Sequence, residues 1–199
     1  MTDNAQVVQD TVAWLERAVI GLNLCPFAKS VHVKGQVHYA VSQATDAAGL
    51  LEDLKFELNQ LVVLDAKARD TTLLIAPYCL SDFLDFNDFL AVADRALAKL
   101  RLDGVLQIAS LHPQYQFADT AADDVTNFTN RSPYPTLHLL REDSIDRAVA
   151  AFPNPESIFE VNMQTMERLG VEGWAALQVG CTRHTTTTVA SSDDEYQKN

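Results

Sequence analysis

The spacing of apolar residues along the chain predicts five helices. Apolar side chains recur every three or four positions over residues 7–22, 45–63 and 85–100, which is the period of a helix that buries one face. Two shorter segments near the end of the chain, 144–152 and 155–169, follow the same period. These segments would supply the helical part of the fold.

Four other segments have the patterns of β-strands. Residues 31–41 alternate apolar and polar side chains around Gly35, which favours a half-exposed strand or a hairpin. Residues 71–77 are almost continuously apolar, which is typical of a strand that is covered on both faces. Residues 105–111 and 136–141 predict two further strands.

The order of these elements predicts the fold class. Strands that alternate with helices, followed by two strands that a long loop joins, indicate an α+β fold. We expect a two-layer sandwich with a four- or five-stranded sheet and helices mainly on one face, and the ferredoxin-like type is the preferred arrangement. No linker divides the chain, so residues 1–175 are expected to form a single globular domain, followed by a flexible polar tail over 176–199.

Charge and cysteine content narrow the classes of partner and location. The chain carries a formal net charge of −12 at pH 7, which repels phosphate backbones, so we expect no nucleic-acid partner. No apolar run reaches the roughly 18 residues that a membrane span requires, so we expect no membrane partner. The three cysteines lie far apart, and the first ten residues lack the features of a signal peptide. Free thiols in a reducing cytoplasm are therefore expected.

The first candidate for chemistry is Cys25, which precedes Pro26 at the end of the first predicted helix. A residue before proline disfavours helical geometry, so this helix should stop at or before Cys25. Pro26 suits the first position of a new helical turn, which would make Cys25 its N-cap. A thiol there faces unpaired amides and the positive end of a helix dipole, which favours a nucleophilic or metal-binding thiolate. The alternative is a buried free cysteine that packs as a small hydrophobic residue.

The second candidate is the segment 112–135, which has no clear period. Loops longer than ~12–15 residues inside compact domains are usually functional or disordered, and this one is rich in Tyr, Phe, Gln and Asn. His112 follows a predicted strand directly and can exchange a proton near neutral pH. It could instead cap backbone groups of that strand.

The third candidate is the end of this segment together with the strand that follows it. The guanidinium of Arg131 suits a carboxylate or phosphate ligand, or it could pair with Asp123 or Asp124 earlier in the loop. Tyr134 precedes a proline, which raises the chance of a cis peptide bond. His138 lies within the strand, where it is either a proton-transfer group or a satisfied core histidine.

Together these residues predict an enzyme that acts on a small anionic metabolite. Cys25 would be the nucleophile or redox thiol, and His112 or His138 the acid or base. The expected substrate-binding groups are Arg131 as the anion clamp, with Tyr115, Tyr134, Gln114 and Asn130 around it. Two alternatives stay open: a non-catalytic module that binds a small ligand or a metal through the same residues, and a structural or partner-binding protein in which they fix the long loop. The sequence identifies no cofactor, and we assign no metal site.

The same stretches resemble a known family. Gly21–Ala28 (GLNLCPFA), His112–Phe117 and Asn130–Glu142 (NRSPYPTLHLLRE) are similar, in order and spacing, to the bacterial family with plant relatives that is catalogued as domain of unknown function 1415. The resemblance covers roughly residues 7–170. It implies that these stretches belong to one shared design, and it implies no activity.

A fainter resemblance is to thioredoxin-type proteins. Cys25–Ala28 (CPFA) is similar to a glutaredoxin C-P-F-C that lacks its second cysteine. Tyr134–Leu137 (YPTL) is similar to the segment whose cis-proline faces the reactive thiol in that fold. This resemblance implies a thiol-dependent function as a further alternative.

Overall fold

A computed structural model of the protein describes residues 3–150, 154 and 157–182. The strands of this part of the chain are β1 Val37–Val41, β2 Thr71–Ile75, β3 Leu106–Leu111 and β4 Thr136–Arg141. They form one open sheet in the order β1-β2-β4-β3. β1 and β2 are parallel, whereas β4 runs antiparallel to both of its neighbours.

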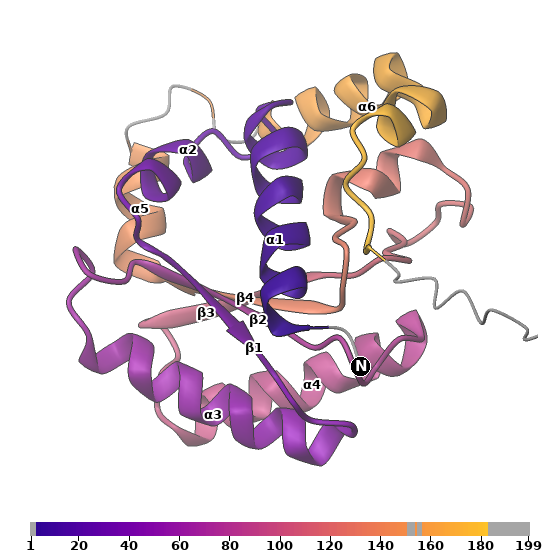
Figure 1. The fold of residues 1–199 in the computed structure, drawn as a ribbon. Helices are drawn as coiled ribbons and strands as arrows, with labels where there is room; N and C mark the ends of the chain where they lie inside the picture. Colours follow the sequence, from indigo (N-terminus) through magenta and orange to yellow (C-terminus); the bar gives the residue numbers. More distant parts are fainter. Residues whose placement is uncertain (1–2, 151–153, 155–156, 183–199) are drawn as a thin grey trace, which may run out of the picture.

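Two long helices cover one face of the sheet (Figure 1). They are α3, Ala47–Val63, and α4, Phe83–Lys99. α3 connects the parallel strands β1 and β2 as a crossover helix, which packs its apolar stripe back onto the sheet. The core on this face contains Leu50, Leu54, Leu58, Leu61, Leu74, Phe86, Phe89, Leu137 and Leu139.

Helices also cover the opposite face (Figure 1). α1, Asn4–Trp14, lies here and continues as the π-helical turn η1, Leu15–Ile20. Its buried stripe packs on the other side chains of the central strands, because successive residues of a strand point to opposite faces. The core on this face contains Val7, Trp14, Leu15, Ala18, Leu73, Ile75, Tyr134 and Val179.

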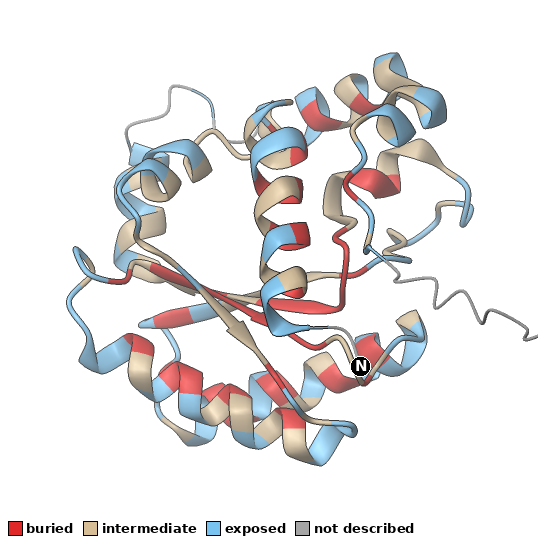
Figure 2. Ribbon diagram, in the orientation of Figure 1, coloured by how far each residue is buried: buried red, intermediate tan, exposed pale blue. Residues whose placement is uncertain are grey.

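The fold class expected from the sequence is confirmed, and the layering is corrected. The structure is an α+β fold with four strands in its described part. It has three layers rather than two, because helices cover both faces of the sheet. The expected arrangement, with helices mainly on one face as in a ferredoxin-like sandwich, is therefore not observed. The central strand β2 is buried along its whole length between the layers (Figure 2), as its almost continuously apolar pattern predicted.

The predicted strand over 31–41 begins later than expected. Residues up to Val33 belong to the short helix α2, Ala28–Val33, which has no buried residue. The chain then turns at Gly35, whose φ of 67° is a conformation that glycine adopts readily, and β1 follows at Val37. The alternation before this turn therefore did not reflect burial in a sheet.

The second half of the chain forms the long loop and the last helices. Residues 112–135 join β3 to β4 and contain a 3-10 helix, η2, Val125–Asn130. α5 is Glu142–Ala150 and α6 is Ser157–Ala176. Gly170, with a φ of 65°, interrupts α6 where the last predicted helix was expected to end. The expected start of that helix, at residue 155, lies outside the described residues.

Residues 177–182 pack along α1, although they fall within the stretch predicted as a tail. Val179 is buried, and Thr182 donates hydrogen bonds from its amide and its hydroxyl to the Asp10 carboxylate. Arg17 donates to the carbonyls of Leu177 and Gln178. Residues 183–199 lie outside the described part.

Candidate functional site

His112 is packed among apolar side chains on the face of the sheet that α4 covers. It is fully buried, with its ring centroid 5.4 Å from that of Phe83 and 5.0 Å from that of Phe86 on α4. The Gln114 amide donates to Nδ1 (3.0 Å), so Nε2 carries the proton and donates to the Leu80 carbonyl (3.1 Å). Burial lowers the pKa of His112. Both ring nitrogens are therefore engaged by the backbone of a neutral imidazole, as in the capping alternative.

His138 faces the other side of the sheet. It is paired with Leu73 of β2, which belongs to the core under α1. Thr71 donates its hydroxyl proton to the Leu139 carbonyl (2.6 Å), so Nε2–H of His138 donates to Thr71 Oγ1 (2.8 Å). Burial lowers the pKa of His138 to about 4. Since His112 contacts α4 on the opposite face, the two imidazoles cannot share one cavity.

Arg131 is used inside the long loop. Its guanidinium lies 4.5 Å over the Phe128 ring and donates to the carbonyls of Tyr115 (3.4 Å) and Ala122 (2.7 Å). Burial lowers its pKa, and it forms no ion pair within the described residues. Asp124, a possible partner, instead accepts hydrogen bonds from the amide and hydroxyl of Thr126 at the start of η2. The observed contacts of Arg131 thus fix the path of the loop.

Other predicted ligand groups take part in the same network. The Asn130 carbonyl accepts a hydrogen bond from the His112 amide (3.2 Å). The Tyr115 ring packs between Phe83 and Phe117, with centroid distances of 5.3 and 5.0 Å. Gln114 is exposed and contributes its backbone amide. The two predicted stretches of the loop therefore do meet, and their polar groups satisfy one another.

Tyr134 is tied to α1 by a buried carboxylate. Its hydroxyl donates to Asp10 Oδ2 (2.7 Å), and Asp10 also accepts from Gln6 and twice from Thr182. Burial raises the pKa of Asp10, but these hydrogen bonds outweigh it and the net shift is downward. Burial and the Asp10 carboxylate both raise the pKa of Tyr134. No peptide bond in the described part of the chain is cis, including the one after Tyr134.

Cys25 lies in the turn between η1 and α2. Its carbonyl accepts from the Ala28 amide (3.2 Å), and α2 begins at Ala28 with Phe27 as its N-cap, so Cys25 is not the N-cap of a helix. The neighbouring Leu24 packs near Phe128 of the loop. In the described part of the chain no hydrogen bond or ion pair joins Cys25 to His112, His138 or Arg131. The catalytic and binding roles of these residues stay predictions, and His112 and His138 lie on opposite faces of the sheet.

Two residues that the sequence analysis did not single out hold this region together. Asn127 is fully buried; its Oδ1 accepts from the Phe117 amide and the Thr120 hydroxyl, and its Nδ2 donates to the Ala121 carbonyl. The second is Asp10, which is itself one of the buried positions of α1. A carboxylate within the buried stripe of a helix was a signal that could have indicated a buried hydrogen-bond network.

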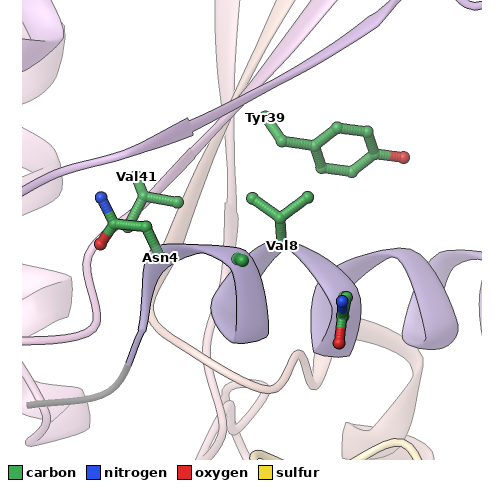
Figure 3. Close-up of a pocket in the computed structure, with 6 residues that line it drawn as sticks. Asn4, Val8, Tyr39 and Val41 are labelled. Atoms are coloured by element: carbon green, nitrogen blue, oxygen red, sulfur yellow. The ribbon is translucent and has the colours of Figure 1, made fainter.

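A different feature is the best candidate for a binding site: the free edge of β1. A groove opens on each side of this strand. The α1-side groove, with a volume of about 520 Å³, is lined by Asn4, Ala5, Val8, Gln9, Tyr39 and Val41. In Figure 3, Val8 of α1 lies opposite Val41 and Tyr39 of β1. The α3-side groove, with a volume of about 490 Å³, is lined by Ala40, Ser42, Glu52, Asp53, Phe56 and Leu74 among others.

Tyr39, which lines the α1-side groove, carries a hydroxyl that is buried from solvent. This hydroxyl has no hydrogen-bond partner among the residues that the structure describes. Burial and the charge of Glu16 raise its pKa to about 12. A buried hydroxyl without a partner costs about 1–3 kcal/mol, so this wall of the groove is not optimised for stability alone.

At the inner end of the α3-side groove, a buried ion pair neutralises one carboxylate. Arg69 Nη2 donates to Glu57 Oε2, and Arg69 Nε donates to the Thr72 hydroxyl (2.9 Å). Both charged side chains are about nine-tenths buried. The described part of the chain contains no group of three or more His, Cys, Asp or Glu residues that could hold a metal ion. No helix in that part is long and apolar enough to cross a membrane.

These observations define the class of protein: an α+β domain with an open mixed sheet, a long loop between β3 and β4 that is held by hydrogen bonds within it, and grooves on both sides of an edge strand. The chain belongs to the family described as a protein of unknown function, DUF1415, whose model matches residues 6–176. This match confirms the resemblance drawn from the sequence motifs. The comparisons with curated proteins and with solved structures found no match.

Proposed function

We propose that this protein is a non-catalytic binding module that holds a segment of another polypeptide in extended conformation along β1. Strand addition of this kind takes its affinity from main-chain hydrogen bonds at a sheet edge and its specificity from pockets for alternate side chains. The single observation that carries the proposal is a groove on each face of the same edge strand. An added strand points successive side chains to opposite faces, so it needs room on both.

The backbone of β1 supports this proposal. The Gln36 carbonyl accepts from the Thr71 amide, and the Ser42 amide donates to the Ile75 carbonyl. Even-numbered residues of this segment therefore bond to β2. Because the direction alternates along a strand, the amides and carbonyls of Val37, Tyr39 and Val41 point to the free edge. None of the five residues of β1 is buried, unlike those of β2.

The geometry favours this function over the expected Cys/His/Arg enzyme. The nitrogens of His112 and the guanidinium of Arg131 already bind backbone groups, so neither is free for a small anionic metabolite. Their contacts support the alternative in which the motifs fix the loop. The free thiols Cys25, Cys79 and Cys181 fit a reducing compartment, so a cytoplasmic location stays part of the proposal.

Selection of binders from a library of random heptapeptides on phage tests this function. Wild-type protein should enrich peptides, and Val41→Pro should abolish the enrichment, because proline removes an amide that points to the free edge while β1 keeps its bonds to β2. Val41→Ala keeps the amide and is the matched control, which should retain enrichment. Val37→Pro, at the first strand position, is the second blocking variant if Val41→Pro unfolds.

The opposite results would refute the proposal. Absence of enrichment with the wild-type protein would do so. Enrichment that both folded proline variants retain would also do so, because the peptides would then bind elsewhere.

A further inference from the structure

The two grooves beside β1 differ in charge. We propose that the strand added there alternates apolar and cationic residues, with the apolar side chains in the α1-side groove and lysine or arginine side chains in the α3-side groove. This inference rests on the proposed function and adds the chemistry of the partner.

Asp53 gives the α3-side groove its charge. This half-buried carboxylate accepts a hydrogen bond from Ser42 Oγ (2.5 Å) and makes no ion pair in the described part of the chain. Glu52 adds a second carboxylate at the rim, where it contacts Lys55 (2.7 Å). The charge of Glu57 is already matched by Arg69, so Asp53 is the carboxylate left to receive a cation.

Apolar residues line the same groove as this carboxylate. Ala40, Leu74 and the exposed ring of Phe56 line the same groove. Such walls suit the aliphatic stem of a lysine or arginine, which packs on apolar surface while its charged end reaches a carboxylate. A hydrogen bond between two charged groups is about twice as strong as one between neutral groups.

None of the described residues that line the α1-side groove is charged. Val8 and Val41 contribute apolar surface, and Asn4 and Gln9 contribute neutral amides. The Asn4 amide oxygen is already bonded to Gln43 Nε2 (2.9 Å). A branched apolar side chain is therefore the complement of this groove.

The same charges argue against a second copy of this chain as the occupant. If two copies paired their β1 strands antiparallel about a twofold axis, their α3-side grooves would lie on the same face of the joined sheet, next to each other. Each would carry its Asp53 and Glu52 carboxylates, in a chain whose net charge is −12. Like charges close together across paired strands are destabilising, whereas a basic segment removes the repulsion.

Three end-capped heptapeptides test the inference on the full chain. Each has valine at alternate positions, and the intervening residues are all lysine, all glutamine or all glutamate. Isothermal titration calorimetry should give the order lysine, then glutamine, then glutamate, with about a tenfold lower affinity at each step, since tenfold corresponds to one charge-assisted contact. Asp53→Asn should lower the affinity for the lysine peptide about tenfold and leave that for the glutamine peptide unchanged.

The control variant is Asp88→Asn, which removes the same charge from an exposed position of α4 and should leave all affinities unchanged. Asp53→Lys should reverse the preference so that the glutamate peptide binds more tightly. If the three peptides bind with equal affinity, and Val41→Pro abolishes this binding, the inference is overturned and the proposed function stands. Failure of both the peptides and the phage library would overturn both proposals.

Two other results would also overturn the inference. The first is lysine-peptide binding that survives Val41→Pro, which would mean general attraction to an acidic surface. The second is a dimer in sedimentation velocity that Val41→Pro dissociates, which would identify a second copy as the occupant.

Discussion

Replacing His138 by glutamine should remove much of the dependence of stability on pH below neutrality. The Nε2–H of His138 donates to Thr71 Oγ1 (2.8 Å), and burial lowers the pKa of His138 from 6.5 to about 4. The folded protein therefore holds a neutral ring over a pH range in which the unfolded chain binds a proton. Glutamine can keep the hydrogen bond through its amide nitrogen but cannot be protonated.

Proton linkage gives the sign and the size of the effect. Between the two pKa values the unfolded chain binds more protons than the folded protein, so the free energy of unfolding rises with pH. The contribution of His138 is present above the unfolded pKa of 6.5 and is lost as pH falls toward the folded value of about 4. At about 1.4 kcal/mol for each pKa unit, the loss between pH ~7.5 and ~4.5 is about 2–3 kcal/mol.

Urea denaturation followed by circular dichroism measures this loss at several pH values. The free energy of unfolding of the wild type should fall by about 2–3 kcal/mol more than that of His138→Gln over this range. Leu139→Val, at the next position of the strand, is the control: it should cost about 1 kcal/mol at every pH, because only packing is lost. Equal pH dependence of wild type and His138→Gln would refute the reasoning, as would an NMR titration of His138 near pH 6.5.

Three further substitutions test other contacts by urea denaturation. Asp10→Ala should lower the free energy of unfolding by about 3 kcal/mol, because the buried Tyr134 hydroxyl loses its acceptor. A double-mutant cycle with Tyr134→Phe should give a coupling energy of about 1–2 kcal/mol, and a coupling near zero would contradict this hydrogen bond. Glu57→Ala should lower the free energy of unfolding by about 3–5 kcal/mol, because it leaves Arg69 buried and unpaired. The double variant Glu57→Leu/Arg69→Met should recover most of this stability, and no recovery would argue against the unpaired charge as the cause. His112→Ala should cost about 3 kcal/mol or more, since it opens a cavity and frees two backbone groups, and a cost below about 1 kcal/mol would show that the ring is not held as described.

The elements with strong periods could be predicted from the sequence, but their layering could not. The apolar stripe of 45–63 and the apolar run of 71–77 correspond to α3 and β2, because burial selects side chains directly. A stripe shows that a helix is covered, but not which face of the sheet it meets, so α1 on the opposite face from α3 was missed. Over residues 31–33 the alternation was too short to separate a strand from one helical turn.

The polar residues of the long loop were singled out for chemistry, and the structure shows several of them bonded to the backbone of the loop and of neighbouring segments. A buried loop must satisfy its backbone amides and carbonyls with side chains, and it uses the same residue types as a catalytic site. Arg131 binds two carbonyls, and His112 binds a carbonyl and an amide. Asn127 binds three groups of the loop. From the sequence these two uses look alike, because spacing does not show whether a donor faces the backbone or a cavity.

The free edge of β1 could not be predicted, because an edge is defined by the strand order. Both that order and the register of β1 with β2 depend on tertiary contacts that the sequence pattern does not show. An exposed edge is a hazard, since any extended chain can add to it. β1 is short, and its α3-side groove holds Asp53 and Glu52, so strands of like charge are repelled. A net charge of −12 extends this repulsion to copies of the same chain. If strands do add at β1 as proposed, the same negative charge favours basic segments over acidic ones.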